Sequence, residues 1–572
     1  MKVAALSPRS RNQDIARLAS QHFDVLVVGG GVNGAGAALD AASRGLSVAL
    51  VEARDFAAGT SSRSSKLIHG GLRYLEMLDF GLVAEALSER GLLAQRLAPH
   101  LVKPVAFLYP LRHLGWERLY AGAGVALYDA MATVSGTRGG IPYHRHLTRR
   151  GALKLAPCLR RESLTGALMY YDAQVDDARH TLFLARTAAT YGAVVTTQTR
   201  VTSLVRDDAG VGVVGANLLD EETGQTLRVT AGCVVNATGV WTDDIEAMAT
   251  GAAQMTVRAS KGVHLVVHRD RIDSEVGMIL RTEKSVLFVI PWNSHWLIGT
   301  TDTEWKHGRD HPASTSTDIN YLLEHVNAVL VTPLSRTDVI GAYVGLRPLL
   351  TGAATSTAKL SREHTITHPV PGLVSVAGGK YTTYRVMAQD AIDEAVTDLA
   401  ERDRVPVSCT AEVPLAGAEG YRALTNCVPR LAEQAGVSTE TVTRLLGRYG
   451  SLVTEVIGPA AEDPSLLEPV PGAPGYLRAE IRYAATHEGA RHLDDVLTRR
   501  TRISFETDDR GAAAAAPAAA LVAEVIGWTA EMEAAEVRSY EARLSAELAS
   551  QALPSDDEAD AARNRHLRPA EL

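Results

Sequence analysis

The apolar residues near the N-terminus follow the pattern of a strand, a helix and a second strand. Val25–Val28 is a short continuous apolar run, which is typical of a parallel strand buried on both faces. A helical pattern follows from Asn33 to Arg44, and a second apolar run occupies Ser47–Val51. Val194–Leu219 then alternates as antiparallel strands do. This order predicts an α/β fold that begins with a parallel sheet.

A second group of strands is expected between residues 255 and 305. Its apolar runs are Val263–Val267, Val286–Pro291 and Trp296–Gly299. Alternation along Ser260–His268 places Lys261 on one face of its strand and His264 on the other, because successive side chains of a strand point in opposite directions. A lone histidine on a strand is more often structural than catalytic, so the pattern alone leaves both roles open for His264.

The last third of the chain is predominantly helical in pattern, from about Tyr421 to Leu548. Gly511–Ala520 is an alanine tract broken by Pro517, and we predict a loop there because proline interrupts helices. Residues 1–22 and 549–572 are polar and charged, which predicts disordered ends.

Composition indicates an ordinary globular protein of more than one domain, because 572 residues exceed what a single core supports. The formal charge of −8 gives no reason to expect nucleic acid as a partner. The four cysteines stand far apart, which predicts free thiols, a reducing compartment and no metal site. No apolar run is long enough for a transmembrane helix or a signal peptide. We therefore expect a cytoplasmic protein whose membrane contact, if any, is peripheral.

The first strand runs directly into a dinucleotide fingerprint, Gly29-x-Gly31-x-x-Gly34. The first glycine allows a tight turn, the second lets the backbone approach a pyrophosphate, and the third lets the helix pack on the strand. Glu52 ends the second strand, where an acidic side chain accepts hydrogen bonds from a ribose. The fingerprint by itself does not distinguish FAD from NAD.

A loop rich in serine follows, from Ala58 to Glu76. Short hydroxyls and exposed amides suit a cradle for the phosphates and ring of a cofactor, and a solvated loop is the plainer alternative. The cofactor contacts expected here are Thr60, Ser61, Ser62, Ser65, Lys66, His69, Gly70 and Gly71.

Two later strands also end in small residues. The strand from Cys233 leads into Ala237, Thr238 and Gly239, and the strand from Val374 leads into Gly378, Gly379 and Thr382. Small residues at strand ends let the backbone approach a cofactor, although a plain turn would explain the first of them. Lys380 and the helix that begins after it are placed to face the cofactor ring and to stabilise negative charge.

These segments, with the run T-S-S-R-S-S-K-L-I-H-G-G-L-R-Y-L-E, resemble the FAD-dependent, aerobic glycerol-3-phosphate dehydrogenase family of the D-amino-acid-oxidase-like flavoproteins. The resemblance implies FAD and a Rossmann-like FAD-binding domain of the D-amino-acid-oxidase/glutathione-reductase type. It also implies an antiparallel-sheet substrate domain and a C-terminal all-helical cap. The expected segments are 23–95, 172–250 and 340–400 for the FAD domain, 96–171 and 251–339 for the substrate domain, 401–412 for a linker, and 413–548 for the cap.

The resemblance also implies the substrate site. Its catalytic residues would be His264, Arg347 and Lys380, with His264 as the base. The substrate contacts would be Arg73, Tyr74, Lys261, Thr301 and Arg362. Several cations suit a phosphate dianion, whereas surface salt bridges would explain the arginines if no flavin motif flanked them. We interpret Asp176 and Asp177 primarily as acidic residues at the start of a helix.

The implied activity is oxidation of sn-glycerol 3-phosphate to dihydroxyacetone phosphate in glycerol catabolism, with electrons passed to a membrane quinone. Residues 112–161 carry many cations and the aromatic residues Trp116, Tyr120 and Tyr128, which suits docking on the inner membrane face, and a helix packed on a core is equally compatible. The alternatives are an oxygen-using oxidase, an amino-acid oxidase of the same fold, and a flavin-binding interaction protein without turnover. A homodimer is compatible with the sequence.

Overall fold

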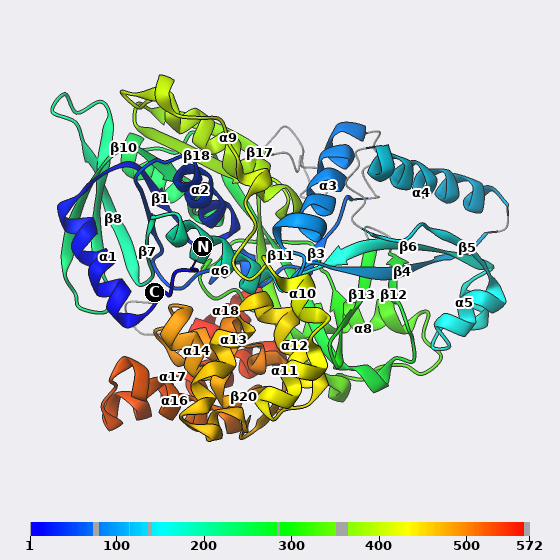
Figure 1. Ribbon diagram of the computed structural model, residues 1–572. Coiled ribbons are helices and arrows are strands. Elements are labelled where there is room, and N and C mark those ends of the chain that lie inside the picture. The colour runs from blue at the N-terminus through cyan, green and yellow to red at the C-terminus, as the bar shows by residue number, and fades with distance from the viewer. Residues whose placement is uncertain are drawn as a thin grey trace.

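The computed structural model describes residues 2–71, 79–113, 115–134, 140–282, 286–350 and 364–564. Two large sheets stand side by side, and a helical domain formed by the C-terminal third lies against both of them (Figure 1). This arrangement matches the predicted fold class.

The first sheet has the spatial order β17-β18-β10-β1-β2-β7, with β9 beside β10 and β8 beside β9. The core strands β18, β10, β1, β2 and β7 are parallel, and β8, β9 and β17 pair antiparallel. The bounds are β1 His22–Val28, β2 Val48–Val51, β7 Val194–Thr196, β8 Thr199–Arg206, β9 Val213–Asp220, β10 Thr226–Asn236, β17 His364–Val370 and β18 Leu373–Gly378.

Both faces of this sheet are covered, as the apolar run at its centre predicts. Val25 and Val27 pack toward the helices α2, α6 and α9, while Leu26 and Val28 pack on the opposite side with Leu18 of α1. The helices around the sheet are α1 Pro8–Ser20, α2 Val32–Ser43, α6 Asp177–Thr190, α7 Thr242–Thr250 and α9 Tyr384–Val396.

The second sheet has the order β15-β11-β14-β13-β12-β4-β6-β3, with β16 beside β11 and β5 beside β6. Its pairings are antiparallel except for β12 with β4. The bounds are β3 Leu67–Ile68, β4 Lys103–Leu111, β5 Arg145–Thr148, β6 Gly166–Gln174, β11 Val257–His268, β12 Gly277–Arg281, β13 Val286–Trp292, β14 His295–Gly299, β15 Thr303–Trp305 and β16 Val339–Leu350. Residues 340–350, assigned to the FAD domain from the sequence, therefore belong to the second sheet.

Helices cover the second sheet on both faces. One apolar cluster joins the sheet to α3 and α4, and another joins its opposite face to α5 and α8. The bounds of these helices are α3 Phe80–Leu92, α4 Trp116–Val134, α5 Arg149–Leu155 and α8 Ser316–Asn327.

The C-terminal third forms a helical domain that includes one short hairpin. The hairpin strands are β19 Pro469–Val470 and β20 Ala473–Leu477. The helices are α10 Tyr421–Thr425, α11 Val428–Ala435, α12 Thr439–Tyr449, α13 Val453–Ile457, α14 Arg478–His487, α15 Ile503–Glu506, α16 Ala512–Ile526, α17 Ala530–Ala552 and α18 Asp556–Asn564.

The predicted loop at Gly511–Ala520 is wrong, because α16 spans most of it with Pro517 inside the helix. Alanine has the highest helix propensity, and Ala514, Ala515, Ala518 and Ala519 are buried against the rest of the domain. Propensity and burial together outweigh the backbone hydrogen bond that the proline cannot make.

The predicted disorder of residues 1–22 is also wrong for the described residues 2–22. The Ser7 hydroxyl caps α1, Pro8 occupies its first turn, and the Arg11 guanidinium pairs with Asp220 at 2.5 Å. Leu18 is fully buried against the first sheet. Tertiary contacts therefore order a segment whose composition resembles a disordered tail.

The other predicted tail, residues 549–572, contains the end of α17 and the whole of α18. Ala559 of α18 is fully buried in an apolar cluster with Val240, Trp305 and Leu346. The predicted disorder is therefore wrong for residues 549–564, and residues 565–572 lie outside the described part of the chain.

Candidate functional site

The turn after β1 is tight enough to require two of its glycines. Gly29 has φ of +109°, and a Cβ atom there would lie 2.7 Å from the carbonyl oxygen of Ala237. A Cβ atom on Gly34 would lie 1.8 Å from the Gly29 carbonyl oxygen, so any side chain would push α2 away from the strand. Gly31 precedes α2, and its Cβ position faces only the Ser61 hydroxyl at 3.3 Å. The fingerprint therefore forms the close strand–helix turn that the sequence predicts.

Glu52 lies beside this turn at the end of β2. Its Oε2 atom accepts a hydrogen bond from the amide of Gly30 at 2.6 Å, and Oε1 accepts one from the amide of Arg54 at 2.8 Å. Burial raises the pKa of this carboxyl above its ordinary value. The carboxylate is thus held next to the helix N-terminus, where a ribose is expected.

The serine-rich loop packs between the two sheets, and its hydroxyls make specific bonds. Ser61 Oγ accepts a bond from the amide of Val32 at 2.9 Å, at the start of α2. Thr60 Oγ1 donates to the carbonyl of Leu346 at 2.5 Å, in β16 of the second sheet. The loop therefore joins the cofactor turn to the second sheet, which a solvated loop would not do.

Lys66 was predicted to contact the cofactor, and the structure gives it a partner in the protein. Its ammonium is fully buried, pairs with Asp177 Oδ1 at 2.8 Å and donates to the carbonyl of Ser62 at 3.1 Å. Arg502 of the C-terminal domain pairs with the same Asp177 oxygen at 2.6 Å. Asp176 accepts from the amide of Arg179 and so caps α6, as its predicted place at a helix start implies.

The remaining predicted cofactor residues lie at strand ends around the same turn. Thr382 Oγ1 bonds both the amide and the carbonyl of His69, at 3.1 and 3.0 Å, and so joins β3 to the start of α9. The Gly70 amide donates to the Tyr128 hydroxyl at 2.8 Å. Positive φ angles occur at Gly71, Gly239, Gly378 and Gly379.

Ala237 and Thr238 end β10 against the glycine turn, and Thr238 Oγ1 donates to Asn236 Oδ1 at 2.7 Å. Lys380 precedes the short helix Tyr381–Thr383, which leads into α9 as predicted, and its side chain is buried. The strand ends that the sequence singled out therefore meet at one edge of the first sheet.

His264 faces this edge from the second sheet. The imidazole is buried, and Ser65 Oγ lies 2.8 Å from its Nε2 atom. Nδ1 is buried and has no partner among the described residues. Burial and the cations Arg347 and Lys66 hold the pKa of His264 well below its ordinary value, so the ring is neutral and one nitrogen can accept a proton.

Arg347 lies on the same face of the second sheet as His264. In the antiparallel register of β11 and β16, His264 pairs with Tyr343, Gly262 with Gly345, and Ser260 with Arg347. Pairs two residues apart along a strand share a face, so the His264 and Arg347 positions are separated by two glycines. No side chain from these two strands stands between them.

The Arg347 guanidinium is fixed by the loop after β14. It donates to the carbonyl of Thr301 at 3.2 Å and to Thr300 Oγ1 at 3.2 Å, and it lies 3.4 Å from Asp302 Oδ1. Thr301, predicted to bind substrate, therefore holds the arginine through its carbonyl. Its hydroxyl accepts from the amide of Val263 at 3.0 Å.

Lys261 is on the opposite face of β11, as the alternation predicts, and the structure does not bring it to His264. Its ammonium pairs with Asp318 of α8 at 2.6 Å and with Asp556 of α18. Substrate binding by Lys261 is therefore contradicted by its buried ion pairs. The other predicted substrate residues, Arg73, Tyr74 and Arg362, lie outside the described residues.

Sequence reasoning missed Tyr343, which stacks on the His264 ring with centroids 4.9 Å apart and an interplanar angle of 9°. A signal was present, because Tyr343 precedes Arg347 by four residues and alternation puts both on one face of a strand.

The three aromatic residues predicted to lie on a membrane-facing surface differ in their exposure. Trp116 and Tyr120 are exposed, whereas Tyr128 is fully buried and donates to Asp172 at 2.6 Å.

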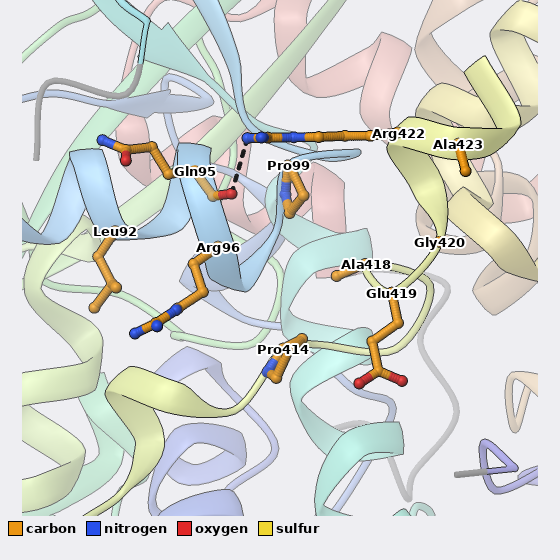
Figure 2. A pocket seen from close by; sticks show the side chains of 10 residues that line it. All are labelled: Leu92, Gln95, Arg96, Pro99, Pro414, Ala418, Glu419, Gly420, Arg422 and Ala423. Atoms are coloured by element: carbon orange, nitrogen blue, oxygen red, sulfur yellow. Dashed lines mark hydrogen bonds between the residues drawn. The ribbon is translucent and has the colours of Figure 1, made fainter. Parts of the chain in front are cut away.

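A separate cleft of about 590 Å³ lies between η3 (Leu93–Leu97) and the first turn of the C-terminal domain (Figure 2). Arg422 spans one end of it by donating to the carbonyl of Gln95 at 3.1 Å. None of the predicted site residues that the structure describes lines this cleft. Within the described ranges, no cluster of three or more His, Cys, Asp or Glu side chains could hold a metal ion.

Comparison with known proteins gives two family matches that together span most of the chain. Residues 24–385 match the family described as FAD dependent oxidoreductase. Residues 408–533 match the family described as the C-terminal domain of alpha-glycerophosphate oxidase.

Individual relatives agree along nearly the whole length. Glycerol-3-phosphate dehydrogenase 2 of Mycobacterium tuberculosis is 56% identical, over 97% of this chain and 94% of that one. Mitochondrial glycerol-3-phosphate dehydrogenase of Homo sapiens is 36% identical, over 87% of this chain and 70% of the human one. The crystal structure of glycerol-3-phosphate dehydrogenase from Bacillus halodurans, complexed with FAD, has 30% identity and a TM-score of 0.78, and covers 94% of this chain and 98% of that one.

Proposed function

The chain belongs to the FAD-dependent glycerol-3-phosphate dehydrogenase family, and we propose that it oxidises sn-glycerol 3-phosphate to dihydroxyacetone phosphate and passes the electrons to a membrane quinone. The observation that carries the substrate proposal is the pairing of a neutral His264 with Arg347 on one face of β11 and β16, across Gly262 and Gly345. This face meets the edge of the first sheet where the cofactor residues gather.

The residues present fit FAD. The Gly29 turn admits no side chain, the N-terminus of α2 opens beside Gly31, and the Glu52 carboxylate lies next to both. The Ser61 hydroxyl bonds the first amide of α2, where it can also reach a phosphate. Strand ends at Ala237–Gly239 and Gly378–Gly379 complete the cradle.

Bound FAD supplies the hydride acceptor, its N5 atom, for the hydrogen on C2 of the substrate. His264 is our candidate for the base that takes the proton of the C2 hydroxyl, because its ring is neutral and Nδ1 has no protein partner in the described part of the chain. Ser65 bonds the other ring nitrogen and so fixes which nitrogen is left to the substrate.

Arg347 is our candidate for the group that binds the phosphate and stabilises the developing alkoxide. Its guanidinium is held by Thr300 and Thr301 on the face of the sheet that also carries His264. A guanidinium held in this way presents donors in the fork geometry that suits a phosphate. Arg73, Tyr74, Arg362 and Lys380 are proposed to share the anion, as the family resemblance implies.

Helix α4 supports the proposed contact with the membrane. It lies at the outer edge of the second sheet, away from the C-terminal domain (Figure 1). Trp116, Leu119, Tyr120 and Leu127 recur on one side at helical spacing and are 63, 76, 55 and 41% exposed. The opposite side of the helix packs on the sheet through Val125, Tyr128 and Ala132.

Exposed cations surround this apolar stripe. They are Arg112, just before the helix, and Arg145 in the neighbouring strand β5. Aromatic and apolar groups beside arginines suit the headgroup region of an anionic leaflet, so we propose a peripheral contact of α4 with the cytoplasmic face of the membrane. No helix within the described ranges is both long and apolar enough to cross a bilayer.

The substrate proposal is tested by anaerobic bleaching of the bound flavin. Glycerol 3-phosphate should reduce the flavin, whereas glycerol, lactate and D-alanine at equal concentration should not. Glycerol tests the need for the phosphate, and D-alanine tests the amino-acid oxidase alternative. Equal bleaching by glycerol would contradict a phosphate-binding role for the arginines.

The acceptor is tested separately by following reoxidation of the reduced flavin in stopped flow. A soluble quinone should reoxidise it much faster than air-saturated buffer does. Fast oxygen consumption with stoichiometric peroxide would instead indicate an oxidase.

A further inference from the structure

Tyr343 and His264 form a cross-strand pair between β16 and β11. Their rings are stacked almost parallel, with centroids 4.9 Å apart and 9° between the planes. Directly opposed positions in an antiparallel pair bring side chains into contact on one face of the sheet. The phenol ring therefore forms one wall against which the imidazole lies.

The Tyr343 ring is itself held in place. Its hydroxyl donates to the carbonyl of Ser64 at 3.1 Å, and Phe505 packs on it with centroids 5.7 Å apart. The Lys66 ammonium lies 5.0 Å from the ring centroid. Contacts with two segments other than its own strand fix the plane of the ring.

The imidazole is held by two further contacts. Ser65 Oγ lies 2.8 Å from Nε2. A Cβ atom on Gly299 of β14 would lie 2.3 Å from His264 Cδ2, so only glycine leaves room for the ring at this angle. Tyr343, Ser65 and Gly299 thus restrict the ring from three directions.

We infer that Tyr343 is a positioning residue, whose ring sets the plane of the His264 imidazole so that Ser65 bonds Nε2 and Nδ1 is left for the substrate hydroxyl. This inference rests on the proposed function, because it assigns His264 to the oxidation of glycerol 3-phosphate. Tyr343 contacts His264, the proposed base, and affects the reaction only through the position of that ring.

Charged groups around the pair indicate what removal of the ring would change. Arg347, paired with Asp302, and Lys66, paired with Asp177, both face His264 and favour its neutral form. Arg502 of the C-terminal domain lies beyond Lys66 and pairs with the same Asp177. Burial is the largest cause of the low pKa of His264, and the Tyr343 ring provides part of that burial.

The contribution of the Tyr343 ring to this burial determines the direction in which the pH profile of flavin reduction shifts. His264 acts as a base only when it is neutral, so the reduction rate falls as the pH drops through its pKa. Replacing the ring with a smaller side chain admits water, which raises the pKa toward its ordinary value. The acidic limb of the rate profile should therefore move to higher pH.

The experiment compares FAD-loaded wild type with Tyr343→Phe and Tyr343→Leu in anaerobic stopped flow with glycerol 3-phosphate across a pH range. Tyr343→Leu should lower the limiting rate of flavin reduction about tenfold and move the acidic limb up by about one pH unit. Tyr343→Phe keeps the ring and should stay close to wild type in both respects. Tyr343→Met replaces the leucine variant if the latter does not retain FAD.

Tyr321→Leu is the matched control, because Tyr321 packs on His325 of α8 with ring centroids 4.1 Å apart, outside the site. It should leave the profile unchanged. A leucine variant that keeps the wild-type rate and limb would overturn the inference, and so would equal losses in the phenylalanine and leucine variants. A wild-type flavin that glycerol 3-phosphate does not reduce would instead contradict the proposed function itself.

Discussion

Lys261 and Asp556 form an ion pair that joins strand β11 of the second sheet to the last described helix. Asp318 of α8 completes the cluster at 2.6 Å from the same ammonium. The lysine is almost fully buried, so these carboxylates are the groups that compensate its charge. Strand β11, helix α8 and helix α18 therefore meet at one lysine.

We predict that Asp556→Asn lowers the free energy of unfolding by about 1 kcal/mol, since Asp318 remains to compensate the lysine and Asp556 is partly exposed. Denaturant titration of the holoenzyme measures the difference. Asp557→Asn is the control, because this neighbouring carboxylate is 89% exposed and pairs only loosely with His307, at 3.5 Å. Equal effects of the two substitutions would show that the buried pair adds nothing specific.

Arg347→Ala should remove about 3 to 4 kcal/mol of transition-state stabilisation, as the loss of one oriented donor does. The measurement is kcat/KM with glycerol 3-phosphate and a dye acceptor. Arg258→Ala, on the exposed end of β11, serves as the control for a lost cation and should behave as wild type. An unaltered kcat/KM in the Arg347 variant would show that Arg347 neither binds the substrate nor stabilises the transition state.

Glu52→Ala should weaken FAD retention about 10- to 100-fold, because hydrogen bonds to a charged group contribute about 1.5 to 3 kcal/mol each. Flavin fluorescence during dilution or dialysis gives the dissociation constant. The exposed carboxylate of Glu275 offers a control, Glu275→Ala, for which retention should not change. A fully yellow Glu52 variant after prolonged dialysis would count against the ribose contact.

The membrane proposal predicts that Leu119→Glu reduces co-sedimentation with anionic vesicles, because this residue is the most exposed of the α4 stripe. Activity with a soluble acceptor should persist, since α4 packs on the sheet through its other side. Val331→Glu places the same charge at an exposed apolar residue elsewhere and should leave vesicle binding intact. Arg118 is unsuitable for this test, because it donates to the carbonyl of Leu147 at 2.8 Å.

His492 predicts a pH-dependent contribution to stability. Burial is the largest single influence and lowers its pKa, but the hydrogen bonds to Glu222 and Glu536 and the nearby carboxylates together raise the pKa to about 10. A group whose folded-state pKa is raised stabilises the fold fully below its unfolded pKa, near 6.5, and loses that contribution as the pH rises toward 10. The Tm difference between wild type and His492→Gln should therefore shrink between pH 6.5 and pH 10. A Tm difference that stays constant over this pH range would contradict the raised pKa of His492.

The cofactor turn could be predicted because local backbone rules determine it. Gly29, Gly34 and Glu52 stand at fixed places relative to two strands and one helix, and the structure shows the contacts that require them. Strand alternation also predicted correctly that Lys261 and His264 face opposite ways.

What the sequence could not reveal depends on distant partners. The role of Tyr343 follows from the register between β11 and β16, which are separated by several other strands along the chain. Alternation places Lys261 on a face without saying that α8 and α18 cover that face. Helix α1 and helix α18 have polar compositions and are ordered by contacts with distant parts of the chain, such as Arg11 with Asp220 and Lys261 with Asp556.

The position of α18 has a consequence for biosynthesis. Ala559 of this helix rests on Val240, Trp305 and Leu346, which belong to segments made much earlier. Helix α18 can therefore dock only on strands that have already been synthesised, and Lys261 lacks the carboxylate of Asp556 until it does. Docking of α18 is thus a late step in folding that completes the ion pairing of a lysine buried in the second sheet.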